Sequence, residues 1–146
     1  MPQQTALSRI DGATAPGAAT VLIKVPADRD YLVLIRSAAA HLGARVGCTV
    51  SEITDLRLAV DEACTLLLAH RPPLEAPWAA ELECRIIVLT DALAVTVAAP
   101  ADGLPAPEPD SFGWTILSAL VDTLAWGVED GVARVELIKR RAGGGS

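Results

Sequence analysis

The sequence predicts an α/β protein of the α+β type, a two-layer sandwich in which a mixed, mostly antiparallel sheet carries three helices on one face. Two predicted helices follow each other directly, and four of the five predicted strands form hairpin pairs. Helices that are grouped rather than alternating with strands are typical of an antiparallel-dominated sheet. The 146 residues are 51% hydrophobic with one Phe, one Tyr and three Trp, so one domain with an aliphatic core is expected.

The first strand and the first helix are predicted from residues 20 to 42. TVLIKV (20–25) has the composition of a strand, and Pro26 ends it. A helix follows, with Asp28 and Asp30 in its first turn, where the helix dipole favours anions. The spacing of its apolar residues predicts a buried stripe of Tyr31, Leu34, Ile35, Ala38 and Leu42.

The second helix begins with a capping box and ends before two prolines. Thr49 and Glu52 have the spacing of that box, and the pair Pro72-Pro73 sets the end. Its predicted core stripe consists of Ile53, Leu56, Val60, Ala63 and Leu67. A different side of the helix carries Asp55, Glu62 and Leu66.

Two hairpins and a third helix complete the predicted fold. ELECRIIVLT (81–90) and ALAVTV (92–97) alternate as the strands of a hairpin. A loop with four prolines then leads to a helix whose predicted buried side is Trp114, Leu117, Leu120, Val121 and Leu124. Asp130-Gly131 is a hairpin turn between LAWGVE and VARVELIK, the last strand.

The ends of the chain are expected to lie outside the domain. Residues 1–18 are polar and small, which predicts a flexible tail, and the folded domain is expected to span residues 19–141. The closing residues 142–146, AGGGS, have the composition of a flexible linker remnant.

The charge balance argues against several classes of partner. The formal net charge is -6 with a pI of about 4.8, and the basic residues form no long run. Direct binding to nucleic acid or to an anionic membrane is therefore disfavoured. The longest apolar stretches, such as Ile86 to Leu89, are too short to span a bilayer, and the N-terminus lacks the order of a signal peptide. A cytoplasmic protein is expected.

The cysteines and histidines do not have the spacing of a metal site. Cys48, Cys64 and Cys84 are widely separated and form no CxxC pair, so they are expected to be small core residues, although a redox role stays open. His41 and His70 lie near predicted helix ends with no second ligand nearby in the sequence. No metal site is predicted.

Residues 25–70 resemble the helical half of bacterial anti-sigma factors of the stress-response and sporulation type. The most diagnostic segments are DLRLAVDEACT (55–65) and FGWTILSALVDTL (112–124), and the likeness covers roughly residues 20–140. These factors are serine kinases of the GHKL (Bergerat-fold) ATPase class. The resemblance implies a homodimer that holds an alternative sigma factor away from RNA polymerase until an anti-anti-sigma factor with a STAS domain competes for it. Kinase-active members phosphorylate a serine of that antagonist with ATP.

The resemblance also places a nucleotide site, in which two residues of the second helix are compared first. In the family a Glu acts as general base and an Asn four residues later binds Mg²⁺. Glu62 matches the Glu, but Leu66 stands at the Asn position. An alkyl group cannot coordinate a hard cation, although residues at i and i+4 share one side of a helix.

Three further positions depart from the family pattern. The Asp that binds adenine corresponds to Ala99, unless a gap brings Asp102-Gly103 into its place. Only Gly113 is left of the second glycine box, and a Thr of the last strand corresponds to Arg134. The preceding loop contains prolines, which lack an N–H, and the acidic Glu108 and Asp110, which would repel a triphosphate.

The expected function is therefore a non-enzymatic anti-sigma factor that needs no cofactor, with Glu62 and Gly113 as remnants. Glu62 can equally be a solvated surface residue. Two alternatives remain: a serine kinase with an unorthodox site that uses ATP and Mg²⁺, and a STAS-binding adaptor that never meets a sigma factor. Candidate partner-binding residues on the first helix are Asp28, Arg29, Asp30, Val33 and Arg36, which can also be ordinary solvated residues.

Overall fold

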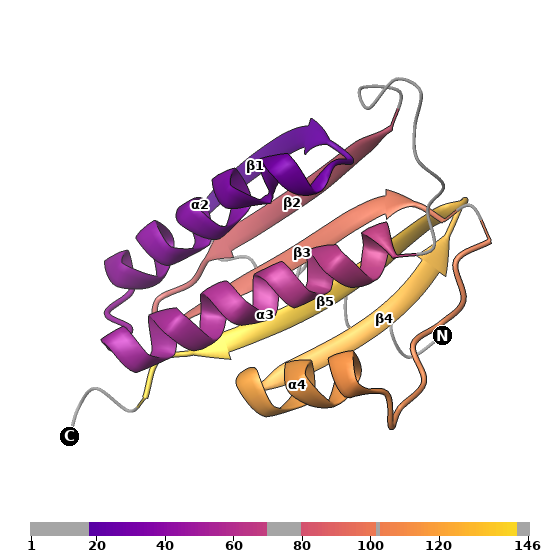
Figure 1. The fold of residues 1–146 in the computed structure, drawn as a ribbon. Coiled ribbons are helices and arrows are strands. Elements are labelled where there is room, and N and C mark those ends of the chain that lie inside the picture. The colour runs from indigo at the N-terminus through magenta and orange to yellow at the C-terminus, as the bar shows by residue number, and fades with distance from the viewer. Residues whose placement is uncertain (1–17, 70–79, 102, 143–146) are drawn as a thin grey trace.

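A five-stranded antiparallel sheet carries three α-helices on one face (Figure 1). The computed structural model describes residues 18–69, 80–101 and 103–142. In chain order the elements are β1 (Ala19–Pro26), the 3-10 turn η1 (Arg29–Tyr31), α2 (Leu32–Arg45), α3 (Val50–Leu68), β2 (Glu81–Val88), β3 (Ala92–Pro100), α4 (Phe112–Leu120), β4 (Thr123–Glu129) and β5 (Val132–Arg140).

The strands lie in the order β1-β2-β3-β5-β4, and each neighbouring pair of these five strands is antiparallel. The predicted two-layer sandwich and its order of elements are confirmed. The last strand in the sequence lies inside the sheet, where it pairs with β3 on one side and with β4 on the other.

The core lies between the sheet and the helices, as the strand alternation predicts. On β2 it is lined by the buried Leu82, Cys84 and Ile86, while Glu81 and Glu83 are not buried. Cys64 of α3 is also fully buried, so Cys64 and Cys84 are core residues as expected. Cys48, just before α3, is only half-buried.

The chain enters α2 through a short turn, and the buried face of the helix differs in part from the predicted stripe. The Asp28 carboxylate accepts a hydrogen bond of 2.9 Å from the Asp30 backbone N–H and caps η1. Tyr31 is 40% exposed and Leu34 is 54% exposed, so the predicted stripe was wrong at these two positions. The buried residues of α2 are Leu32, Ile35, Ala39 and Gly43.

The capping box at the start of α3 is present as predicted. The Thr49 hydroxyl accepts from the Glu52 N–H at 3.1 Å, and the Glu52 carboxylate accepts from the Thr49 N–H at 2.7 Å. Of the predicted stripe, only Ile53 is not fully buried. A Cβ on Gly43 of α2 would lie 3.0 Å from Leu56 Cδ2, so the two helices approach closely at this glycine.

The third helix is shorter than predicted. α4 ends at Leu120, and Leu124 belongs to β4. The chain turns into the sheet because Asp122 bonds to β5 twice: its N–H donates to the Ile138 carbonyl at 2.9 Å, and its carboxylate accepts from the Arg140 N–H at 2.8 Å. The predicted Asp130-Gly131 turn is confirmed, with positive φ angles of 54° and 75°.

Some expectations concern residues outside the described ranges. They include the tail up to residue 17, His70 and the closing GGGS. Among the helices that the structure describes, none is long and apolar enough to cross a membrane.

Candidate functional site

The second half of α3 and the first turn of α4 bring three predicted site residues together. A Cβ placed on Gly113 would lie 2.7 Å from Glu62 Oε2 and 3.6 Å from Leu66 Cδ2. Both side chains therefore lie against the start of α4, as the i, i+4 spacing on α3 predicts. Because Gly113 has no side chain, the Glu62 carboxylate can approach the α4 backbone closely.

The start of α4 has the polarity that favours an anion. Ser111 is the N-cap, and its hydroxyl accepts a hydrogen bond of 3.3 Å from the Trp114 N–H. The dipole of a helix places partial positive charge at this end. Since the Glu62 carboxylate lies against this turn, the protein itself supplies a negative group there.

A pocket of about 260 Å³ lies next to these residues, between α3, the loop that precedes α4, and β4. Leu66 and Ala69 form its α3 side, and Trp126 of β4 forms another wall. The loop contributes residues 104–108, which include Glu108, and Ser111 also lines the pocket. Most of the lining is apolar, so the pocket offers few groups that could bind phosphate.

The structure places Arg134 away from the Glu62 carboxylate, whereas Ala99 lies on the helix side of the sheet. Ala99 is 3% exposed and packs in the core. Arg134 is paired with Ala98 and lies between the core residues Ala133 and Val135, so its side chain is on the sheet face opposite the helices. Asp102, the alternative adenine residue, lies outside the described residues.

The candidate partner-binding residues lie in the η1 turn with its cap and in the first turns of α2. Arg29 and Asp30 are exposed, and Val33 is 49% exposed. Asp28 is half-buried and caps η1, while Arg36 forms an ion pair of 3.4 Å with Asp61 of α3.

Sequence reasoning missed the apolar part of this surface. Tyr31 and Leu34 are exposed beside Val33, although the periodicity assigned them to the core. The three residues form what we call the α2 patch. In the run LVLI (32–35) every position is apolar, so the pattern alone does not show which residues face the core.

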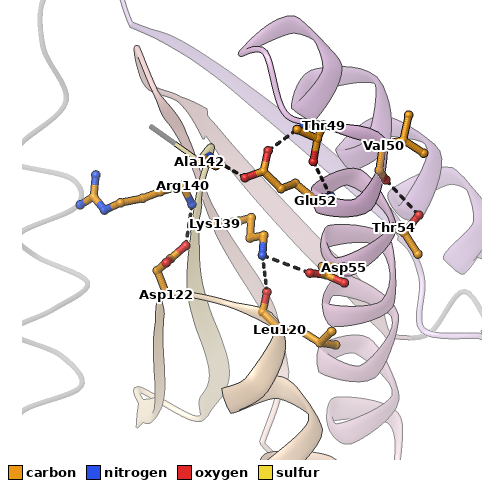
Figure 2. Close-up of polar contacts among 10 residues, drawn as sticks. All are labelled: Thr49, Val50, Glu52, Thr54, Asp55, Leu120, Asp122, Lys139, Arg140 and Ala142. Atoms are coloured by element: carbon orange, nitrogen blue, oxygen red, sulfur yellow. Dashed lines mark hydrogen bonds and ion pairs between the residues drawn. The ribbon is translucent and has the colours of Figure 1, made fainter. Parts of the chain in front are cut away.

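A second group of polar contacts lies at the other end of α3 (Figure 2). Lys139 of β5 donates a hydrogen bond of 2.8 Å to the Leu120 carbonyl at the end of α4, and its Nζ lies 3.4 Å from Asp55 Oδ2. The Glu52 carboxylate also accepts from the Ala142 N–H. The backbone hydrogen bond from Thr49 is the largest cause of the lowered pKa of Glu52.

The thiols have different surroundings, which set their ionisation. Burial raises the pKa of Cys84 to about 12 and raises that of Cys64 well above its ordinary value. The pKa of Cys48 is also raised by burial, with the Glu52 charge as a smaller cause. Among the described residues, no group of three or more His, Cys, Asp or Glu side chains could hold a metal ion.

Comparison with known proteins identifies the family of this fold. A family model described as the histidine kinase-like ATPase domain matches residues 25–139. The chain belongs to this family. The resemblance seen in the sequence is thereby confirmed, and the ATPase-like domain accounts for the element order and the sheet described above.

Relatives of this ATPase-like domain carry names from one group of regulators. The chain is 32% identical over 108 residues to the anti-sigma-F factor RsbW of Mycobacterium tuberculosis (strain H37Rv). This alignment covers 73% of this chain and 60% of the relative. It is 38% identical over 80 residues to the serine-protein kinase RsbW of Bacillus subtilis (strain 168), covering 55% of this chain and 49% of the relative. The chain thus spans about half to three-fifths of these relatives.

A solved structure has the same fold as the ATPase-like domain. The crystal structure of the RsbU and RsbW domains of Rv1364c from Mycobacterium tuberculosis aligns with a TM-score of 0.61 and 16% identity. The alignment covers 84% of this chain and 32% of the other. At this identity the likeness supports the fold alone.

Proposed function

We propose that this protein is an anti-sigma factor that binds an alternative sigma factor in the cytoplasm and keeps it from RNA polymerase. A STAS-domain anti-anti-sigma factor releases it by competition, and the protein acts as a homodimer. The similarity to the anti-sigma-F factor RsbW of Mycobacterium tuberculosis supports the anti-sigma role. We further propose that the protein does not phosphorylate its antagonist.

Leu66 beside Glu62 is the observation that carries the proposed loss of kinase activity. Mg²⁺ requires oxygen ligands in near-octahedral geometry. At this position the pair supplies one carboxylate and an alkyl group, both against the start of α4. The donor set does not fit a magnesium-bound nucleotide, and the apolar lining of the adjacent pocket does not fit its phosphates.

The kinase alternative rests on Glu62, which is present at the family's general-base position. To test it, the protein is incubated with labelled ATP, Mg²⁺ and its STAS antagonist, and phosphate on the antagonist is measured. We expect no transfer above the rate without the protein. Transfer above that background would refute the proposed loss of activity. Leu66→Asn alone is expected not to restore transfer, because Ala99 and the rest of the pocket lining stay unchanged.

The α2 patch is the proposed contact with the sigma factor. Tyr31, Val33 and Leu34 are exposed apolar side chains, flanked by the exposed Arg29 and Asp30. Such a patch rimmed by charges is typical of a protein interface. Asp28 and Arg36 support this surface through the η1 cap and the Asp61 ion pair, and the net charge of -6 favours a basic partner.

The sigma contact is tested with a pair of matched serine variants. Leu34→Ser on the patch is compared with Val50→Ser, which removes an 82% exposed apolar side chain at the start of α3. Binding to each alternative sigma factor of the source cell is measured by calorimetry. We expect Leu34→Ser to weaken one interaction about tenfold and Val50→Ser to leave it unchanged. If the protein binds the STAS antagonist but none of the sigma factors, the adaptor alternative replaces this proposal.

A further inference from the structure

We propose that the pocket beside Leu66 binds a neutral, apolar, ring-shaped small molecule. The inference rests on the proposed loss of nucleotide binding, because it assigns another class of ligand to the same end of α3. It follows from the lining of the pocket, its charge, its size and the hydrogen bonds that hold the covering loop.

The walls of the pocket are suited to a flat apolar ligand. Leu66 and Ala69 line one side, and the Trp126 indole, itself only 8% exposed, lines another. Pro105 and Pro107 belong to the loop side. Proline has no backbone N–H, so these residues cannot contribute to an amide cradle for an anion. Aromatic and aliphatic surfaces of this kind are typical of ligand pockets.

The polar groups of the lining disfavour an anionic ligand. The exposed Glu108 places a carboxylate at the edge of the pocket, which repels a negative charge. The Ser111 hydroxyl already accepts the Trp114 N–H as the N-cap of α4, and its own proton is left to donate one hydrogen bond. A neutral ring with at most one polar acceptor matches this combination.

Backbone hydrogen bonds fix the loop that covers the pocket. The Ala101 N–H donates to the Gly131 carbonyl and the Leu104 N–H donates to the Ala101 carbonyl, both at 2.7 Å. At the other end, the Ser111 N–H donates to the Glu108 carbonyl at 3.0 Å. Because both ends of the loop are held, the pocket is preformed, and a ligand does not have to order the whole loop.

The size of the pocket allows about two rings of a ligand to lie inside it, and because the pocket is partly open to solvent, a third ring can lie at its mouth. An apolar cavity of about 150 Å³ holds benzene. The pocket here encloses about 260 Å³, which leaves room for a ligand larger than benzene but smaller than most drug-sized molecules.

Phenylnaphthylamine, a neutral dye that becomes fluorescent in apolar surroundings, is the probe for this site. We expect saturable binding of one dye per chain. Ala69→Phe and Ala106→Phe, which both add bulk to the lining, should weaken binding about tenfold. Ala44→Phe adds the same side chain on the exposed end of α2 and should leave binding unchanged. Circular dichroism shows whether each variant is folded. If Ala69→Phe does not fold, the loop variant Ala106→Phe still tests the proposal.

The charge argument is tested with the anionic analogue anilinonaphthalene sulfonate. We expect it to bind about tenfold more weakly than phenylnaphthylamine, and Glu108→Gln should reduce that difference severalfold. Unsaturable dye uptake, no dye binding, or equal binding by the two folded filling variants and the wild type would overturn the proposal. The same titration with ATP and Mg²⁺ as competitors tests the proposed function separately. Displacement of bound dye would show that nucleotide binding persists, whereas absent dye binding together with absent ATP binding would refute only the pocket proposal.

Discussion

At the scale of single residues, Glu62 and Leu66 lie together against the start of α4. In the proposed function, Leu66 at this place supplies no ligand for Mg²⁺, although the geometry of the helix pair is unchanged. The sequence predicted this pair because i and i+4 residues of a helix share a side. The sequence also indicates that Arg134 lies on the face of the sheet opposite the helices, because it stands between the apolar core residues Ala133 and Val135.

Thiol reactivity provides a residue-scale prediction. In the folded protein at pH 8, we expect Ellman's reagent to modify Cys48 first, because Cys48 is half-buried whereas Cys64 and Cys84 are fully buried. The raised pKa of Cys84, about 12, and the raised pKa of Cys64 also keep these two groups protonated. All three should react at similar rates in denaturant. Rapid modification of either remaining thiol in the folded Cys48→Ala variant would contradict this expectation.

At the scale of elements, the ends of helices were predicted better where a capping side chain close in the sequence forms the end. Thr49 and Glu52 mark the start of α3 with a recognisable spacing, and the structure has both hydrogen bonds. The end of α4 has no such local mark, because Asp122 stops the helix by bonding to β5, which is distant in the sequence. The burial of Tyr31 and Leu34 was wrongly predicted because the run 32–35 is apolar at every position, so the pattern does not show which of these residues face the core.

The capping box predicts a pH dependence of stability. Hydrogen bonding to the Thr49 N–H lowers the pKa of Glu52, so the stabilisation is present above the ordinary carboxyl pKa and is lost as the pH falls through the lower, folded-state value. Glu52→Gln should therefore reduce the free energy of unfolding at pH 7, with the difference from wild type shrinking toward pH 3. Urea unfolding across this pH range measures it.

Thr49→Ala serves as the control in a double-mutant cycle with Glu52→Gln. It removes the hydroxyl that accepts from the Glu52 N–H, and it should cost about 1 kcal/mol. The two changes should be non-additive, because the residues form one motif. Additive effects that do not vary with pH would show that the box contributes no coupled stabilisation.

At the scale of the whole molecule, Lys139 connects three elements that are distant in the sequence. Its side chain is 13% exposed, and its Nζ contacts Asp55 of α3 and the Leu120 carbonyl of α4 (Figure 2). Lys139→Met should lower the free energy of unfolding by about 1–3 kcal/mol, because a mostly buried charge-assisted hydrogen bond is lost. Chemical denaturation provides the measurement.

Lys24→Met is the matched control for this change. The Lys24–Glu83 ion pair is 3.8 Å long, and the two side chains are 52% and 39% exposed. Solvent screens such a pair, so the variant should lose less than about 1 kcal/mol. Equal losses for the two lysine variants would refute a special role for Lys139. The sequence could not predict the Lys139–Asp55 contact, since 84 positions separate the two residues.

The position of β5 between β3 and β4 has a consequence for synthesis on the ribosome. Of the five described strands, β5 is the last to be made, yet it is the only one of them that pairs with β4. Until Val132–Arg140 has left the exit tunnel, β3 has an open edge and β4 has no neighbour in the sheet. A nascent chain therefore cannot complete this sheet before Val132–Arg140 has been translated, and a protein cut short before Val132 would expose a strand edge that is prone to aggregation.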